Sequence, residues 1–187
     1  MTPILCLYVE WVAWSASWLI AALWSARTQA RPALGSQWPY RLVTTLGFVL
    51  IVGRFAKFVP ADQVWRDPPQ LAWSLCGVAL IGFGVCWWAR LHLGRLWSSS
   101  VTRKADHRIV DTGPYRLVRH PIYTGLIIAA AATAAVQGRA TALMGLVVVI
   151  WGFWLKARLE ERFLRAELGA EAYDAYAART GMLAPGL

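Results

Sequence analysis

Residues 123–155 read YTGLIIAAAATAAVQGRATALMGLVVVIWGFWL, and this stretch decides the fold. It holds two apolar runs, Tyr123 to Val136 and Ala140 to Leu155, which are joined by the short connection Gln137-Gly138-Arg139. So short a connection leaves room only for a tight turn between two antiparallel helices. The stretch therefore predicts a helical hairpin, and the small side chains of Ala129 to Ala132 should let its two arms approach closely.

Three further apolar runs precede this hairpin, at Ile4 to Leu23, Leu42 to Val59 and Leu71 to Ala89. A helix that crosses a bilayer needs about 20 mostly apolar residues. We therefore predict an all-α, polytopic integral membrane protein with about five transmembrane helices, folded as one membrane domain over residues 1–187. The first run lacks a basic leader and contains Glu10, so we expect a retained helix and not a cleaved signal peptide.

The composition agrees with a membrane domain. The chain has 187 residues, of which 58% are hydrophobic and 16% are charged, and its mean hydropathy is +0.44. Soluble domains carry about 25% charged residues, so an ordinary soluble domain and a disordered chain are both excluded. The net charge of +9 is not evidence for nucleic acid, because the basic residues are interleaved with apolar runs. We expect membrane lipid and no nucleic acid as partner.

The distribution of basic residues predicts the orientation. Fifteen of the 19 Lys and Arg residues lie in the first connection, the third connection and the C-terminal tail, and four lie on the opposite side. Lys and Arg prefer the cytoplasmic side of short loops, so we expect the N-terminus outside and the C-terminus in the cytoplasm. The Arg-, Ala- and Trp-rich composition favours a GC-rich bacterial source, and hence a bacterial inner membrane. The sequence does not indicate an oligomeric state.

Two polar segments, residues 90–125 and 156–180, fall on the predicted cytoplasmic side and should together form one site. In the first, Gly113-Pro114 indicates a turn. Pro121 is well tolerated in the first turn of a helix, so a helix should begin here with His120 at its start and Tyr123 one turn inside. Anchoring to lipid headgroups does not require this His-Pro-x-Tyr order.

The second polar segment continues the fifth span as an amphipathic helix that carries Glu160 and Glu161. Adjacent side chains on a helix point about 100° apart, so at most one of the two carboxylates should face a pocket. We expect Glu160 to face inward, and Glu161 to meet a neighbouring arginine or solvent.

At these segments the sequence resembles the isoprenylcysteine carboxyl methyltransferase family, with kinship to membrane phospholipid N-methyltransferases. The matching elements follow one another in the order His107-Arg108-Ile109-Val110, Gly113-Pro114-Tyr115, Arg119-His120-Pro121-x-Tyr123-x-Gly125, Glu160-Glu161-x-x-Leu164 and Gly169 to Tyr176. The resemblance covers roughly Gly82 to the C-terminus, whereas the first two spans are similar only in hydropathy.

The resemblance implies S-adenosylmethionine bound at the cytoplasmic face of the membrane, with methyl transfer to a lipophilic small molecule or a lipid-attached acceptor. Around the cofactor it implies His107, Ile109, Val110, Tyr115, His120, Tyr123 and Glu160. Gly82 and Gly84 also match a Gly-x-Gly of phospholipid methyltransferases, although we interpret them as packing glycines. Lys156 stands where eukaryotic members tend to have a substrate-facing arginine.

Lys156, Arg158 and Glu161 are the candidate catalytic residues. A carboxylate acceptor, which we favour, is already ionised near neutral pH and needs no general base; Lys156 or Arg158 would hold it. An amine acceptor would benefit from a base, for which His120 or Glu161 is the candidate. Phospholipid headgroup N-methylation is therefore the alternative activity.

A rival of another class is a non-catalytic protein that binds haem or metal through histidines, or that serves as an assembly partner. His92, His107 and His120 would fall on one face of the membrane, but they lack carboxylate or cysteine companions at ligand spacing. We interpret Cys6, Cys76 and Cys86 as small buried hydrophobes, and we expect no metal site. The Trp11, Trp14 and Trp18 stripe we interpret as a packing or lipid-facing surface.

Overall fold

The computed structural model describes residues 1–25, 28–30, 34–53, 62–98, 103–104 and 109–186. The helices are α1 (Pro3–Ala22), α2 (Leu34–Val52), α3 (Pro69–Leu93), α4 (Pro121–Gln137), α5 (Ala140–Leu168) and α6 (Ala170–Ala177). The 3-10 turns η1 (Gly94–Leu96) and η2 (Gly113–Arg116) and the short antiparallel pair β1 (Thr28–Ala30) and β2 (Arg103–Lys104) complete the described elements.

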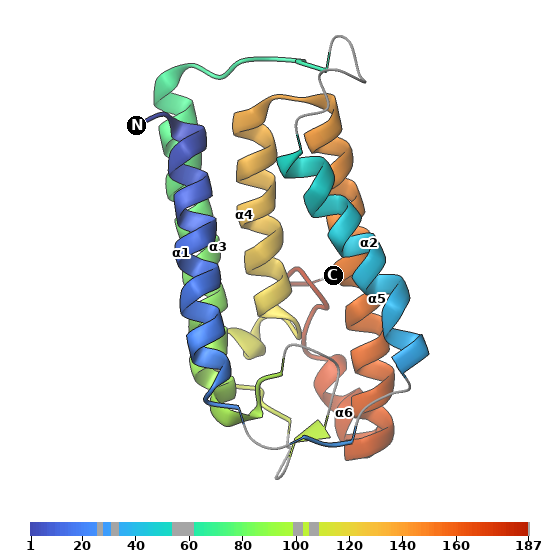
Figure 1. Cartoon of the computed structure of the whole chain (residues 1–187). Coiled ribbons are helices and arrows are strands. Elements are labelled where there is room, and N and C mark those ends of the chain that lie inside the picture. The colour runs from blue at the N-terminus through green and yellow to red at the C-terminus, as the bar shows by residue number, and fades with distance from the viewer. Residues whose placement is uncertain (26–27, 31–33, 54–61, 99–102, 105–108, 187) are drawn as a thin grey trace.

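The five long helices α1 to α5 lie along a common axis and alternate in direction (Figure 1). α6, η2 and the β1–β2 pair gather at one end of this bundle, and the N-terminus lies at the other end (Figure 1). α2 packs mainly on α5 and α3 mainly on α4, with α4 also in contact with α5. The predicted all-helical class is confirmed.

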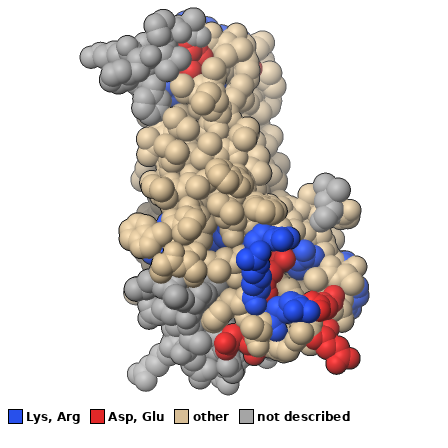
Figure 2. Space-filling model, turned by 90° about the vertical axis from the view of Figure 1, so that its right-hand side faces the viewer, with Lys and Arg blue, Asp and Glu red and all other residues tan. Residues whose placement is uncertain are grey.

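Among the described residues, three helices are long and apolar enough to cross a membrane, namely α1, α3 with its η1 extension, and α5. α4 is apolar but has only 17 residues. One face of the molecule has a broad uncharged band, below which acidic and basic side chains gather (Figure 2). The protein is therefore an integral membrane protein, while the count of five spans stays a prediction.

The predicted hairpin is confirmed between α4 and α5. Gly138 ends α4 in the left-handed conformation with φ of 58°, which costs glycine little. α5 runs without interruption from Ala140 to Leu168, well past the apolar part of the helix, and so carries Glu160 and Glu161 on a rigid extension.

The predicted second span, Leu42 to Val59, is wrong at its start, because α2 begins at Leu34. Its first two turns contain Gln37, Tyr40 and Arg41, which hydrogen-bond to one another and so support a polar helical start that hydropathy does not detect. α2 ends at Val52, and residues 54–59 lie outside the described part of the chain.

Glycines permit the tightest helix contacts. A Cβ built on Gly82 of α3 would lie 2.5 Å from the carbonyl oxygen of Gly125 on α4, and one on Gly145 of α5 would lie 2.7 Å from the carbonyl oxygen of Gly47 on α2. The alanines of α4 are divided between two clusters: Ala129 packs toward α1 and α3, and Ala130 toward α2 and α5. The expected close approach of α4 to α5 is made by Ala130, whereas Ala129 packs on the opposite side of α4, because α4 is central and has neighbours on both sides.

Asp62 caps the start of α5. Its carboxylate accepts hydrogen bonds from the backbone N–H of Thr141 (2.8 Å) and from the Thr141 hydroxyl (2.7 Å), and the guanidinium of Arg139 lies 3.9 Å away. Burial alone raises the pKa of Asp62, but the Thr141 hydrogen bonds and Arg139 outweigh it and hold that pKa below its ordinary value.

We predict that Gly82→Ala destabilises the protein by about 1–3 kcal/mol, because the new methyl group meets the backbone of α4. Gly84→Ala is the matched control, since a Cβ there has no neighbour within 4 Å. The free energy of unfolding in detergent measures both. Equal stability of the two variants would contradict the assigned α3–α4 contact.

We predict that Asp62→Ala costs about 1–2 kcal/mol of stability at neutral pH, because the cap of α5 is lost. A depressed pKa contributes stability above the ordinary value of about 4, and this contribution disappears as the pH falls through the folded-state value. The difference in the free energy of unfolding between wild type and Asp62→Ala should therefore become smaller at acidic pH. Asp111→Ala, at an exposed carboxylate, is the control and should change stability by less than about 0.5 kcal/mol.

Candidate functional site

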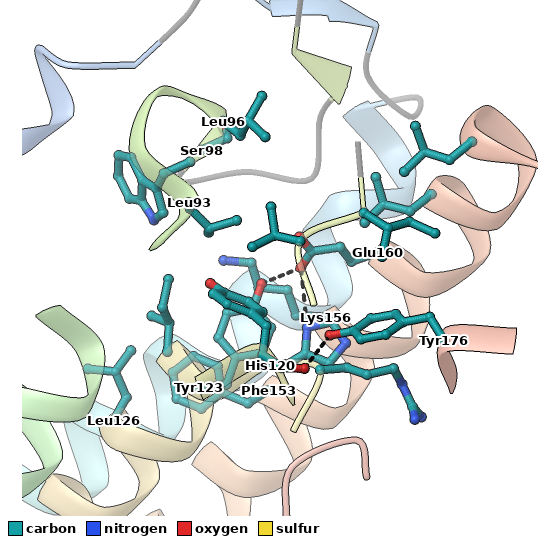
Figure 3. A pocket seen from close by; sticks show the side chains of 18 of the residues that line it. Leu93, Leu96, Ser98, His120, Tyr123, Leu126, Phe153, Lys156, Glu160 and Tyr176 are labelled. Carbon is teal, nitrogen blue, oxygen red and sulfur yellow. Dashed lines mark hydrogen bonds and ion pairs between the residues drawn. The ribbon is translucent and has the colours of Figure 1, made fainter. Parts of the chain in front are cut away.

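A cavity lies at the end of the bundle where α6 packs, and Figure 3 shows most of its lining. Its walls come from α1, the end of α3, η1, η2, α4, α5 and α6. The residues are Trp14, Trp18, Leu93, Leu96, Trp97, Ser98, Ile109, Val110, Tyr115, Arg119, His120, Ile122, Tyr123, Leu126, Phe153, Lys156, Glu160, Leu164, Leu168, Tyr173 and Tyr176. One part of this wall is aromatic and aliphatic, and the other part carries the charged and hydroxyl groups.

The start of α4 aims His120 and Tyr123 into this cavity. Pro121 is the first residue of α4, and the preceding His120 is non-helical with φ of −125° and ψ of 61°. A residue before proline avoids the helical region, so the side chain of His120 leaves the helix axis and points toward α5. The rings of His120 and Tyr123 stack with centroids 5.2 Å apart, and Tyr123 stacks on Phe153 at the same distance.

The C-terminal segment fixes the backbone at this point. Residues 181–183 run beside residues 118–120, with Val118 and Gly181 paired as a parallel bridge. The bonds join Arg119 N to Gly181 O (2.8 Å), His120 N to Met182 O (3.1 Å) and Thr124 Oγ1 to Leu183 O (2.7 Å). These bonds leave the start of α4 little freedom to move.

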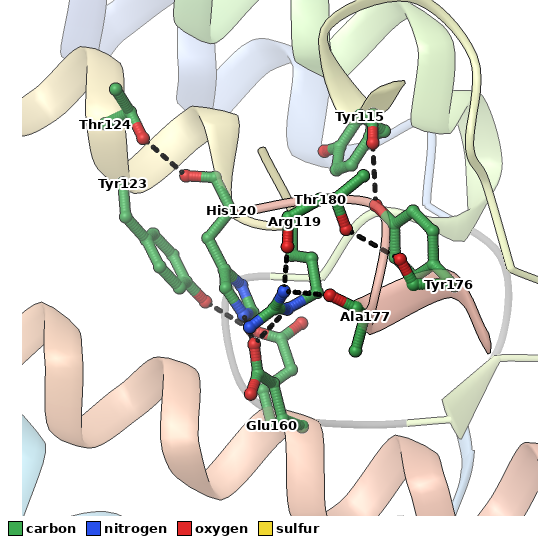
Figure 4. Close-up of polar contacts among 10 residues, drawn as sticks. Tyr115, Arg119, His120, Tyr123, Thr124, Glu160, Tyr176, Ala177 and Thr180 are labelled. Carbon is green, nitrogen blue, oxygen red and sulfur yellow. Dashed lines mark hydrogen bonds and ion pairs between the residues drawn. The ribbon is translucent and has the colours of Figure 1, made fainter. Parts of the chain in front are cut away.

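Two carboxylates of α5 contact His120, each near a different nitrogen of the ring; Figure 4 shows that of Glu160 beside His120 and Tyr123. The Tyr123 hydroxyl donates to Glu160 Oε2 at 2.6 Å, and the same oxygen lies 3.8 Å from His120 Nδ1. His120 Nε2 lies 3.1 Å from Glu161 Oε1, which also accepts a 2.7 Å hydrogen bond from Arg119 Nε. His120 is therefore oriented by one carboxylate that lines the cavity and one that lies behind it.

Lys156 enters the cavity from α5, one turn before Glu160. Its ammonium lies 4.9 Å from the centre of the Tyr123 ring and 5.6 Å from that of Tyr40 on α2. Arg41 lies next to Tyr40 and donates to Gln37 Oε1 at 3.1 Å. The polar start of α2 thus brings a second cation to the neighbourhood of Lys156.

Buried phenols close the remaining side. The Tyr176 hydroxyl of α6 donates to the carbonyl oxygen of Tyr115 at 2.9 Å. Burial raises the pKa of Tyr115, and burial raises the pKa of Tyr176 to about 12. Both phenols are therefore neutral at physiological pH and can serve as hydrogen-bond donors.

Most of the residues singled out from the sequence come together here. Glu160 lines the cavity while Glu161 does not, and Arg158 is exposed, with its guanidinium 5.3 Å from the Trp154 ring. His107 lies outside the described residues. The predicted residues that line the cavity are Ile109, Val110, Tyr115, His120, Tyr123, Lys156 and Glu160.

Sequence reasoning missed the contribution of α1. Trp14 and Trp18, interpreted as packing or lipid-facing residues, both line the cavity, and Trp97 closes it beside Trp18 at 5.4 Å between ring centres. The expected packing role is confirmed as well, since Trp11 and Trp14 both pack on Phe83 in the core. The tryptophans that cluster on α1 and near residue 97 are the sequence feature that could indicate this wall of the cavity. Nothing in the sequence, however, indicates that these two segments meet.

The histidine-based metal site finds no support in the described part of the chain. His92 is exposed and contacts the carbonyl oxygen of Trp88, whereas His120 is engaged with the two carboxylates of α5. Neither belongs to a described group of three metal-ligating side chains.

The fold and the cavity define an integral membrane protein with a charged, aromatic-lined site at the end of an apolar helix bundle. Residues 75–166 match the sequence profile of the isoprenylcysteine carboxyl methyltransferase family. That region contains the start of α4 and the acidic part of α5, and the match confirms the resemblance to this family.

Curated relatives support the assignment. A probable protein-S-isoprenylcysteine O-methyltransferase of rice is 37% identical over 73 residues, or 38% of each chain. Protein-S-isoprenylcysteine O-methyltransferase B of Arabidopsis thaliana is 30% identical over 80 residues, covering 42% of this chain and 40% of the relative. The cobalt-zinc-cadmium resistance protein CzcN of Cupriavidus metallidurans is 30% identical over 136 residues, covering 67% of this chain and 54% of that protein. The chain thus spans well under two thirds of the length of these relatives.

We predict that Arg119→Met loosens the C-terminal segment, because the Arg119 guanidinium links Glu161 to the carbonyl oxygens of Ala177 and Thr180. Amide hydrogen exchange over residues 178–183 should accelerate at least about tenfold. Arg165→Met is the control: it breaks the exposed pair with Asp174 between α5 and α6, and exposed pairs contribute little. Equal acceleration in both variants would refute the role of Arg119 as the link.

Proposed function

We propose that this chain is an S-adenosylmethionine-dependent methyltransferase that O-methylates the carboxylate of a lipophilic or lipid-attached acceptor. The observation that carries the proposal is the convergence of His120, Tyr123, Lys156 and Glu160 in one cavity where the apolar helices end. The match to the isoprenylcysteine carboxyl methyltransferase family supports the reaction class, and the residues of the cavity support the choice of acceptor.

The chemistry of the cavity wall fits S-adenosylmethionine. The cofactor has a positively charged sulfur and an aromatic base, and the cavity offers the carboxylate of Glu160 together with the rings of Tyr115 and Tyr123. Anionic and aromatic groups both attract a sulfonium cation, more strongly where water is excluded. Ile109 and Val110 supply apolar surface, and His107 is a further candidate from the family resemblance.

When bound, S-adenosylmethionine supplies an electrophilic methyl group whose transfer to a carboxylate oxygen forms a C–O bond, breaks the C–S bond and leaves a neutral thioether. The chain's own task is then to orient the acceptor and to exclude water. A hydrogen bond from the Tyr123 hydroxyl holds the carboxylate of Glu160 in position. Glu161, together with Arg119, fixes the orientation of the His120 ring. We assign Glu161 a positioning role, since Arg119 and His120 occupy it and it does not line the cavity.

Lys156 is the residue we propose to hold the acceptor carboxylate. It lines the cavity, and the cation of Arg41 is close enough to add to its field. A carboxylate is ionised near neutral pH, so no general base is required. A cationic amine would be repelled by Lys156, which disfavours phospholipid headgroup N-methylation. Arg158 lies outside the cavity and receives no role.

The aromatic and aliphatic side of the cavity supports a lipophilic acceptor. Trp14, Trp18, Leu93 and Leu96 come from helices that are apolar enough to contact lipid, and Trp97 follows the second of these helices directly. The plant relatives are named for S-isoprenylcysteine, which is a carboxylate on a lipid-modified residue. We propose the same chemical class here, at the cytoplasmic face of a bacterial inner membrane, with the N-terminus outside.

We predict that Glu160→Gln and His120→Ala weaken S-adenosylmethionine binding at least about tenfold, because each removes a charged or oriented partner of the site. Lys156→Met should instead leave cofactor affinity within about threefold and lower acceptor turnover. Calorimetric titration of the detergent-purified protein gives the affinities, with Glu171→Gln on the exposed face of α6 as control.

Turnover is measured with S-adenosylmethionine labelled in the methyl group and total membrane extract. Label in a base-labile, volatile form indicates a carboxyl methyl ester and supports the proposal. Label in methylated ethanolamine lipids would assign headgroup N-methylation instead. Unchanged cofactor affinity in both Glu160→Gln and His120→Ala would remove these residues from the site.

A further inference from the structure

A second cluster of reactive side chains lies outside the cavity. Cys6 and Glu10 of α1 and Cys76 of α3 bring their two sulfur atoms and one carboxylate oxygen within 4.8 Å of one another. This is the one group of three such side chains found among the described residues. Cys6 and Glu10 lie in the first half of α1, near the N-terminus, whereas α6, which contributes to the cavity, lies at the other end of the bundle (Figure 1).

Helix geometry brings these side chains together. Cys6 and Glu10 are four residues apart on α1 and therefore share a face, and the Cys6 thiol donates to Glu10 Oε1 at 3.3 Å. Cys76 is buried in the contact of α1 with α3, beside Leu7 and Ala79. Two adjoining helix faces thus hold the three groups in place without any metal.

Among the described residues, the carboxylate of Glu10 has no positively charged partner. Glu10 Oε2 is inaccessible to solvent and has no hydrogen-bond partner. Leaving such an oxygen unsatisfied destabilises the folded protein, and more so when the oxygen is charged. The described basic side chains do not pair with Glu10, and the donor that its carboxylate does have is the thiol of Cys6.

We propose that Cys6, Glu10 and Cys76 form a binding site for a thiophilic divalent cation, zinc or cadmium. Thiolate ligands select such cations over magnesium and calcium. Tetrahedral zinc with Zn–S of about 2.3 Å and Zn–O of about 2.1 Å needs ligand atoms about 3.6–3.8 Å apart. The observed separations, which reach at most 4.8 Å, require only a small rotation of the side chains.

The charges and atoms balance without any redox step. Binding forms two metal–sulfur bonds and one metal–oxygen bond, and the two thiol protons pass to solvent. Two thiolates and one carboxylate carry three negative charges against two on the metal, which leaves a net charge of −1. Three protein ligands leave a fourth position open for water or another ligand, as in zinc sites that exchange their ligands.

The site could not be found in the sequence. Cys6 and Cys76 lie on different helices and match no spaced ligand motif, so each was interpreted as a small hydrophobe. Cys86 still fits that interpretation: it is fully buried, and its thiol donates to the carbonyl oxygen of Ile122 at 3.4 Å. Cys86 is therefore the natural control, being the same residue type on the same helix as Cys76.

The test is titration of the chelator-treated, detergent-purified full chain with cadmium, followed by thiolate-to-metal charge-transfer absorption. We expect one cadmium per chain by elemental analysis. Cys6→Ser and Cys76→Ser should each reduce the affinity at least a hundredfold, Glu10→Gln about tenfold, and Cys86→Ser should leave it unchanged. Absence of the band in wild type, or an equal loss in Cys86→Ser, would overturn the proposal.

Alkylation of the wild-type protein supplies a measurement that does not depend on how the variants fold. Bound cadmium or zinc should slow the modification of Cys6 by a small alkylating reagent, located by mass spectrometry, at least tenfold. A rate unaffected by metal, or a Cys6–Cys76 disulfide that persists in reductant and excludes the metal, would also overturn the site. Neither measurement requires methyl transfer, so the result is independent of the proposed activity.

Discussion

The pairing of the α5 carboxylates with the start of α4 is the interaction on which the functional end of the molecule depends. A carboxylate near a membrane is costly unless it is paired. Glu161 is paired by Arg119 and His120, and Glu160 by Tyr123. The same contacts fix the direction in which α5 leaves the bundle. Arg119 also donates a hydrogen bond to the carbonyl oxygen of Ala177, which connects these contacts to the end of α6. Site geometry and fold are therefore stabilised by one network.

The rest of the bundle provides the setting for that network. Glycines let α3 approach α4, and α2 approach α5, so closely that their backbones nearly touch. Such contacts are rigid, because no side chain can rearrange within them. They hold the aromatic groups of α1 and α3 against one side of the cavity and the charged groups of α4 and α5 against the other. An acceptor with one apolar and one anionic end would match this division.

Local patterns in the sequence predicted much of this arrangement. The short connection at Gly138 sufficed for the hairpin, and the angular separation of adjacent helical residues sufficed to predict that only one of Glu160 and Glu161 would line the cavity. What could not be predicted depends on contacts between distant segments. The polar start of α2 is stabilised by its own hydrogen bonds, and Trp14 reaches the cavity only because α1 packs beside α3. Hydropathy contains no information about either.

The hydrogen bonds from residues 181–183 to the start of α4 have a consequence for biosynthesis. All the long helices precede this segment in the chain, so residues 181–183 are synthesised after the helices against which they pack. The backbone around His120 therefore lacks these hydrogen-bond partners until residues 181–183 have emerged from the ribosome. The order of translation thus makes the reactive centre one of the last parts of the described chain to reach its final geometry.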